Sequence, residues 1–171
     1  EEEGKFRPIR FGLAAVRGVG AKAVEAIIAA RDEEGPFRSL ADFSKRTQGQ
    51  QVNKRILESL IKCGAFDFTG ICRSRLLAGT DRTMQWAAGQ ARNANSNQMG
   101  LFSSGSAGTE TPDPPLPDIP PWSDKEMLHH EREVLGFYIT AHPLDTYESD
   151  LKRFTSGTIE GTQAITAGGV G

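Results

Sequence analysis

The stretch Val16–Ile28, with the sequence V-R-G-V-G-A-K-A-V-E-A-I-I, decides the fold of this chain. Gly18 and Gly20 predict a tight turn, because glycine tolerates positive φ and allows a close backbone approach. Val19 lies between them and is expected to plug into the core. A helix begins near Ala21. Four apolar side chains at helical spacing are expected to form its buried face: Ala23, Val24, Ile27 and Ile28.

This turn has the chemistry of an anion-binding site. The first N–H groups of a helix have no partner within it, so they point at whatever occupies the turn, and phosphate suits them well. Lys22 and Arg17 add cations there. Upstream, Phe11, Leu13 and Val16 suit a short preceding helix. The pattern favours a helix-hairpin-helix that grips a nucleic-acid backbone without reading sequence; the alternative is an ordinary tight turn between two packed helices.

A second unit of the same kind follows after a short connecting helix. Ser39 predicts the start of the connector, with Leu40 and Phe43 facing inward. Asn53 predicts the start of the next helix, and Gly64 its end. The apolar positions of that helix are Ile56, Leu57, Leu60 and Ile61, and a further helix from about Cys72 carries Leu76, Leu77, Met84 and Ala87 on one side.

The second turn, Gly64-Ala65-Phe66, is a degenerate copy of the first. Phe66 stands where the second glycine belongs and is expected to fill core space, which makes backbone contact with phosphate less secure. Three cations could still surround this turn: Lys62, Arg73 and Arg75. Two such units predict a pseudo-twofold domain that touches both strands across one groove of DNA.

Charge is distributed unevenly over the 171 residues, although the formal net charge is only −2. Residues 5–82 contain 15 Lys and Arg against 8 Asp and Glu, a net +7, whereas residues 83–171 contain 5 against 11, a net −6. The basic half carries both turns, which favours a polyanionic partner for it. A solvated basic helix face is the alternative.

Composition excludes several other classes of protein. Hydrophobic residues make up 37% of the chain, and no apolar run approaches the ~20 residues of a membrane span. Cys63 and Cys72 make no disulfide framework and lack metal-ligand spacing, and the three histidines lie far from them, so we expect no metal site and a reducing compartment. The opening Glu1 and the final I-T-A-G-G-V-G suggest a piece of a longer protein.

The second half contains a linker and one further helix. From Gly89 the composition turns to Asn, Gln, Ser and Gly, and six of the nine prolines lie between Pro112 and Pro121, which predicts a flexible tether with a stiffer, extended end that forms no packed core. A capping box, Ser123–Glu126, predicts a helix that ends at Gly136 and carries Met127, Leu128, Val134 and Leu135. A strand-like run at residues 137–139, a turn at residues 142–144 and a β-strand within residues 163–170 are expected after it.

One apolar cluster, Gln98-Met99-Gly100-Leu101-Phe102, interrupts the polar linker. Burying Leu101 and Phe102 would contribute about 4–5 kcal/mol, yet nothing local covers them. An exposed aliphatic–aromatic pair in a tether is typical of a short motif that enters a pocket on another protein. The alternative is that the pair folds back onto the preceding helix.

Several blocks, in order, resemble bacterial replicative DNA polymerase III α subunits (family C). They are I-R-F-G-L-A-A-V-R-G-V-G at residues 9–20, G-P-F-R-S-L-A-D-F at 35–43, V-N-K-R-I-L-E-S-L-I-K-C-G-A-F-D at 52–67 and L-G-F-Y-I-T-A-H-P-L-D at 135–145. The resemblance covers nearly the whole chain except the variable linker. In this family the last block leads into an OB-fold domain.

The resemblance implies a tandem helix-hairpin-helix that holds duplex DNA leaving the polymerase site. The first hairpin would comprise Gly18, Val19, Gly20 and Lys22, and the second Gly64, Ala65 and Phe66. The apolar cluster is similar to the family's sliding-clamp-binding pentapeptide, in which Gln98 contacts the pocket rim, Met99 packs at its edge, and Leu101 and Phe102 enter the cleft. No catalytic residue is implied here; the parent would be a cytoplasmic polymerase that uses Mg²⁺, with the clamp (β subunit) and other replicase subunits as partners.

We therefore predict a mainly α chain of four parts. Residues 1–91 form the tandem helix-hairpin-helix domain, 92–122 the flexible linker with the clamp peptide, 123–161 a helix and connector, and 162–171 the start of a truncated OB fold. Three alternatives stay open: an error-prone paralogue of the same polymerase family, a repair nuclease or ligase with similar tandem hairpins, and a pure protein-interaction module.

Overall fold

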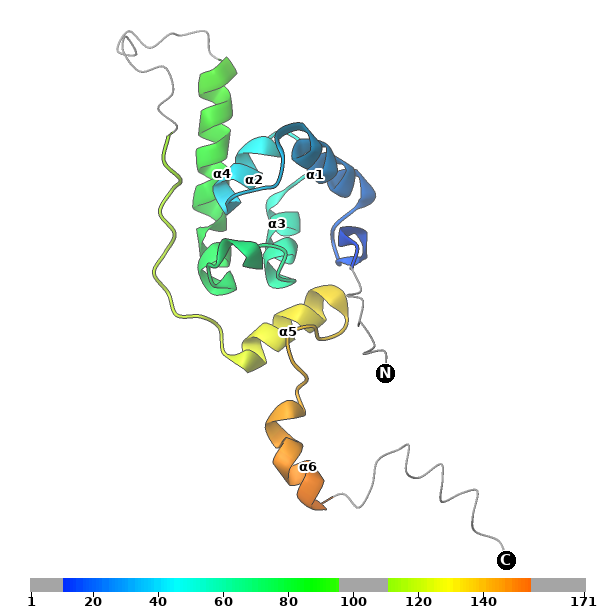
Figure 1. Ribbon diagram of the computed structural model, residues 1–171. Coiled ribbons are helices and arrows are strands. Elements are labelled where there is room, and N and C mark those ends of the chain that lie inside the picture. Colours follow the sequence, from blue (N-terminus) through cyan, green and yellow to red (C-terminus); the bar gives the residue numbers. More distant parts are fainter. Residues whose placement is uncertain (1–10, 96–110, 155–171) are drawn as a thin grey trace, which may run out of the picture.

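The computed structural model describes residues 11–95 and 111–154, and all the regular structure in these ranges is helical (Figure 1). The 3₁₀ turns are η1 (Leu13–Ala15), η2 (Asp67–Thr69) and η3 (Asp145–Tyr147). The α-helices are α1 (Ala21–Glu34), α2 (Leu40–Arg46), α3 (Lys54–Lys62), α4 (Arg73–Asn95), α5 (Asp124–Leu135) and α6 (Glu148–Phe154). Within the described ranges, the mainly α prediction is confirmed.

The order helix, glycine turn, helix occurs twice, as predicted. The first unit is η1–turn–α1, the second is α3–turn–α4, and α2 connects them (Figure 1). One shared core holds both units, because each contributes its apolar stripe to the same interior. The buried members of this core include Val16, Val19, Ile27, Leu40, Phe43, Ile56, Leu57, Leu60, Ile61, Phe66 and Leu76.

Side-chain caps fix where three helices begin. The Ser39 hydroxyl accepts a hydrogen bond from the N–H of Asp42, and the Asn53 amide oxygen accepts one from the N–H of Ile56. Before α5, Ser123 and Glu126 form the predicted capping box, in which each side chain caps the other's backbone N–H. Such caps satisfy orphan donors of the first turn.

The buried face of α1 is narrower than predicted, and Val24 is only partly buried. Ala23 and Ile27 are buried, but Ile28 is 41% exposed, and Ala30 takes its place in the interior. Residues 23, 27 and 30 lie on one side of a helix, whereas residue 28 is turned about 100° from residue 27. The predicted stripe was therefore too wide on one side.

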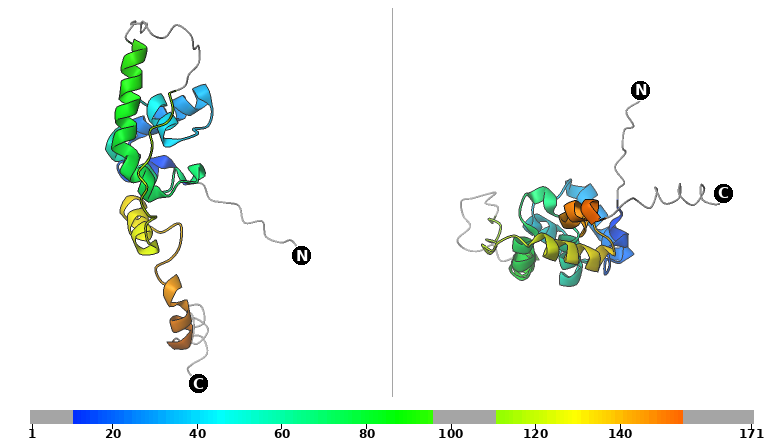
Figure 2. Two further views of the ribbon diagram at one scale, coloured as in Figure 1. Left: turned by 90° about the vertical axis from the view of Figure 1, so that its left-hand side faces the viewer. Right: turned by 90° about the horizontal axis from the view of Figure 1, so that it is seen from below.

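Helix α4 and the proline-rich segment differ from the predicted flexible linker. The helix continues to Asn95, four residues past the expected boundary at 91. Residues 111–122 are extended, as predicted, but they pack alongside α4 (Figures 1 and 2). Leu116 packs against the core at Gly79 of α4. A larger residue at position 79 would collide with the Leu116 side chain. The Pro117 carbonyl accepts a hydrogen bond from Arg75.

The chain beyond α5 forms no strand in the described part. Residues 137–139, predicted as a strand-like run, are a loop that folds back on α5, because the Ile139 N–H donates to the Glu131 carboxylate instead of to a neighbouring strand. The predicted turn at residues 142–144 is present, and α6 lies beyond α5 at one end of the molecule (Figure 2). The cluster Gln98–Phe102 and the predicted OB-fold start at 162–171 lie outside the described residues.

None of the described helices is long and apolar enough to cross a membrane.

Candidate nucleic-acid interface

The first hairpin presents an exposed turn on a buried anchor. Gly18 has φ +86°, a conformation that side chains disfavour, and Val19 beside it is buried in the core as predicted. Gly20 differs from the prediction. Its φ is −79° and its ψ is 160°, because it is the N-cap of α1 and needs extended backbone instead of a positive φ.

Backbone donors are left open at this turn. Among the described residues, the N–H groups of Gly20, Ala21 and Lys22 have no hydrogen-bond acceptor, and no side chain caps α1. These groups lie at the positive end of a helix of 14 residues, where an anion is stabilised by both the donors and the helix dipole. The start of α1 therefore has the open donors that the predicted anion-binding site requires.

Two cations flank these donors. Arg17 and Lys22 are both exposed, and within the described ranges neither side chain has an acidic partner. The backbone at Arg17 is itself fixed, because its N–H donates to the carbonyl oxygen of Val134 at 2.7 Å. The turn is thus held rigidly between the core and the end of α5, while its side-chain charges remain available.

The second hairpin has the same glycine turn but different donors. Gly64 has φ +84°, yet the N–H of Ala65 is already used in a 2.9 Å hydrogen bond to the carbonyl of Leu60. Phe66 is buried, and its ring lies edge-on to that of Phe43, with the centroids 5.1 Å apart. The predicted degeneracy is confirmed: Phe66 fills core space, and the short turn η2 follows it in place of an α-helix.

Arg73 does not serve as a free cation at this hairpin. Its guanidinium lies over Gly64 and pairs with Asp67 at 2.6 Å and with Glu131 at 2.9 Å, and its side chain is 11% exposed. Hydrogen bonds from Arg73 to these two carboxylates, that to Asp67 first, raise its pKa further above its ordinary value despite burial. Two carboxylates therefore neutralise Arg73, which was predicted to contact DNA.

The other two predicted cations of the second hairpin are also engaged. Lys62 Nζ lies 2.8 Å from the Glu133 carboxylate of α5. Arg75 donates to the Pro117 carbonyl and lies 3.6 Å from Asp118 of the proline-rich segment. The structure thus brings together Arg17, Lys22 and the open N–H groups at the first hairpin, and it commits the cations of the second hairpin to other parts of the chain.

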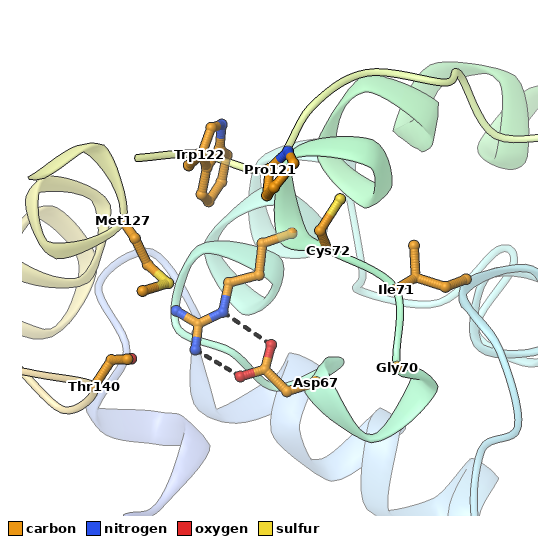
Figure 3. Close-up of a pocket in the computed structure, with 9 residues that line it drawn as sticks. Asp67, Gly70, Ile71, Cys72, Pro121, Trp122, Met127 and Thr140 are labelled. Carbon is orange, nitrogen blue, oxygen red and sulfur yellow. Dashed lines mark hydrogen bonds and ion pairs between the residues drawn. The ribbon is translucent and has the colours of Figure 1, made fainter. Parts of the chain in front are cut away.

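A cavity of about 410 Å³ separates the second hairpin from α5 and the end of the proline-rich segment (Figure 3). Ion-paired Arg73 and Asp67 form one part of its wall, and Thr140 closes another. The remaining lining residues are Gly70, Ile71, Cys72, Pro121, Trp122 and Met127. This lining is mostly apolar and has no pair of groups placed for catalysis, so the cavity adds nothing to the phosphate-binding chemistry.

Sequence reasoning missed the acidic residues of α5 that contact the second hairpin. Glu131 is completely buried and binds Arg73, Thr140 and the N–H of Ile139. A signal for it existed, because Glu131 lies three residues from both Leu128 and Val134, on the apolar face of the predicted helix. A charged residue on a buried face requires a partner.

Metal ligands were not expected here. Over residues 11–95 and 111–154, no three His, Cys, Asp or Glu side chains are grouped so that they could hold a metal ion. Cys63 and Cys72 are both free thiols.

Comparison with known proteins shows what this chain is similar to. A family model described as a helix-hairpin-helix motif matches residues 1–76. DNA polymerase III subunit alpha from Thermus aquaticus is 44% identical over 152 residues, which cover 89% of this chain and 12% of that protein. The chain is homologous to a segment of DNA polymerase III subunit alpha. The predicted resemblance is confirmed.

Other proteins named DNA polymerase III subunit alpha are similar to this chain over most of its length. The subunit alpha of Neisseria meningitidis serogroup B is 40% identical over 90% of this chain, and that of Escherichia coli is 35% identical over 87%. Because about 150 residues align, the similarity to subunit alpha extends beyond the 76 residues of the motif. The chain spans only about an eighth of the length of these relatives.

Proposed function

We propose that this chain is the duplex-DNA-binding segment of a replicative DNA polymerase α subunit, and that the first hairpin is its principal contact. The observation that carries the proposal is the exposed start of α1, where the N–H groups of Gly20, Ala21 and Lys22 have no acceptor among the described residues and the side chains of Arg17 and Lys22 are exposed. The homology to subunit alpha and the helix-hairpin-helix match support a DNA partner for this turn.

The mechanism follows from the geometry of the turn. A phosphate at the start of α1 accepts hydrogen bonds from the open N–H groups, and the positive end of the helix stabilises its charge. Lys22 and Arg17 neutralise neighbouring phosphates. Contacts to phosphate position a duplex but carry no sequence information, so binding of this kind holds and orients the duplex without reading its sequence.

The chemistry of the parent would lie elsewhere in the longer protein. The relatives are named as DNA polymerase subunits, so we propose DNA-directed DNA polymerase activity with Mg²⁺ for the parent. Within residues 11–95 and 111–154, no three His, Cys, Asp or Glu side chains are grouped so that they could hold a metal ion, and we propose no metal ligand among them. The segment binds DNA while the catalytic carboxylates belong to another region.

A second contact is proposed for the peptide Gln98–Phe102. Its sequence places Leu101 and Phe102 between α4 and the proline-rich segment 111–122, on a stretch that joins two docked elements. We propose that this peptide binds the sliding clamp and so tethers the segment to it, with the remaining replicase subunits as further partners of the parent. DNA binding and clamp binding would use separate residues.

Replacement of Lys22 tests the DNA contact. Lys22→Ala should weaken binding to every duplex alike, and it should reduce the slope of log K against log salt by about one. The unsubstituted 171-residue chain, if it neutralises about four to six phosphates, should show a slope near −4 to −5. Fluorescence anisotropy with two unrelated duplexes at several salt concentrations measures both quantities.

Lys152→Ala is the matched control, because it removes the same charge from α6, at the other end of the molecule (Figure 2). Equal losses for the two variants would show that only net charge matters. Strong discrimination between the two duplexes, or binding that ignores salt, would refute the backbone-gripping mechanism.

A further inference from the structure

The side chain of Lys62, at the end of α3, is held by a carboxylate from another part of the chain. Its Nζ lies 2.8 Å from Glu133 Oε2, and the same oxygen lies 3.5 Å from His130 Nδ1. The side chain of Lys62 is 19% exposed and that of Glu133 is 48% exposed, so the pair lies at the surface. Lys62 comes two residues before Gly64 of the second hairpin.

This pair differs from the Arg73 pair next to it. Arg73 is enclosed by two carboxylates and is 11% exposed, and its partner Glu131 is completely buried. Arg73 therefore cannot reach an external phosphate without rearrangement of α5. Lys62 needs only to exchange one surface carboxylate for another anion, and surface ion pairs are weak enough for that exchange.

Glu133 is charged whenever DNA binding would occur. The hydrogen bond from Lys62 lowers the pKa of Glu133 below its ordinary value, and this effect outweighs the small opposing effect of burial. A carboxylate and a DNA phosphate bind an ammonium group through the same charge-assisted hydrogen bonds. The two anions are thus competitors for Lys62.

We propose that Glu133 is an intramolecular substitute for a DNA phosphate, which keeps Lys62 from the duplex and restricts DNA contact to the first hairpin. The inference rests on the proposed DNA-binding function. Its partner is the phosphate backbone of duplex DNA. Removal of the Glu133 charge should release Lys62 and add one phosphate contact at the second hairpin.

The test compares four forms of the 171-residue chain in duplex binding at 50 and 200 mM salt: the unsubstituted chain, Glu133→Gln, Lys62→Ala/Glu133→Gln and Glu148→Gln. One added phosphate contact makes the loss of affinity between these concentrations about threefold to fourfold greater. Glu133→Gln should show this change together with tighter binding at 50 mM. The gain should disappear in the Lys62→Ala/Glu133→Gln variant.

Glu148→Gln is the charge-matched control, because Glu148 begins α6 and its carboxylate pairs with Lys152 there. If it tightens binding as much as Glu133→Gln does, net charge explains the effect and the proposal is wrong. The proposal is also wrong if Glu133→Gln binds duplex DNA as the unsubstituted chain does, or if its gain in affinity remains in the Lys62→Ala/Glu133→Gln variant. Lys22→Ala, measured alongside, separates the two hypotheses: if it has no effect, the proposed function fails, whereas a normal Lys22 effect with no Glu133 effect refutes only this inference.

Discussion

Arg73 and Glu131 form an ion pair of 2.9 Å between residues 58 positions apart, one at the start of α4 and the other on the buried face of α5. Glu131 also accepts hydrogen bonds from the N–H groups of Ile139 and Thr140. This carboxylate therefore fastens α5 and the loop after it to the second hairpin. The hairpin that resembles a DNA-binding element is used, in this chain, to anchor α5.

Glu131→Ala should destabilise the fold by about 3 kcal/mol, because it removes the buried carboxylate that pairs with Arg73, leaving only Asp67, and takes the acceptor from the N–H groups of Ile139 and Thr140. Urea unfolding at pH 7 measures the change. The exposed residue Glu148 provides the control, since Glu148→Ala should change the free energy of unfolding by less than about 0.5 kcal/mol. A loss below 1 kcal/mol for Glu131→Ala would contradict the anchoring role.

The contribution of Glu131 should depend on pH. Burial acts to raise the pKa of Glu131, but hydrogen bonds from Thr140 and Ile139 and the bond from Arg73 outweigh it and lower the pKa below the ordinary 4.5. The unfolded chain therefore takes up the proton first as pH falls. The stabilisation is complete above pH 4.5 and is lost as pH falls through the lowered pKa of the folded state.

Urea unfolding of the unsubstituted chain and of Glu131→Ala, measured from pH 7 to below pH 4.5, checks the direction of the effect. The difference in unfolding free energy between the two proteins should be constant near pH 7 and should narrow progressively below pH 4.5. A difference that widens in acid would mean that Glu131 is stabilised in its protonated form.

The two glycines of the first hairpin should respond differently to alanine. Gly18→Ala should cost about 1–2 kcal/mol, because the new Cβ is strained at φ +86° although it would meet only Ser59 Oγ at 3.7 Å. Gly20→Ala should cost less, about 0.5 kcal/mol, since φ is −79° and the space around it is open, so only the weaker N-capping by alanine counts against it. Thermal unfolding of the two variants compares them directly; equal losses would contradict the backbone conformation described at Gly20.

Local chemistry in the sequence was enough to predict most of the fold. Ser39, Asn53 and Ser123 satisfy helix donors within three residues of themselves, so their caps can be read without knowledge of the rest of the molecule. The same holds for the turns at Gly18 and Gly64, where a positive φ follows from a glycine between two helical patterns.

Long-range partners could not be predicted in the same way. Nothing near Arg73 in the sequence indicates that Glu131 will neutralise it, and the same is true of Lys62 and Glu133. Three cations around a glycine turn therefore suggested a DNA contact, whereas tertiary structure assigned them to other partners. At Gly20 the error was local: helix capping required extended backbone where the turn pattern suggested positive φ.

The clamp hypothesis predicts that two functions can be separated. A peptide of residues 95–105 should bind a bacterial sliding clamp with a dissociation constant near 1 μM, or about −8 kcal/mol. Leu101→Ala combined with Phe102→Ala should abolish clamp binding by the whole chain and leave duplex binding unchanged. Isothermal calorimetry measures the first and anisotropy the second. Unchanged clamp affinity in the double variant would show that this pair is not the contact.

The central claim, that duplex DNA is held at the start of α1, is tested most directly by NMR titration of the ¹⁵N-labelled chain with a short duplex. The account predicts that the amide signals of Gly20, Ala21 and Lys22 shift most, in proportion to bound DNA, and that those of Gly64 and Ala65 shift little. Shifts confined to the second hairpin, or no shift at the start of α1 when the duplex is bound, would contradict it.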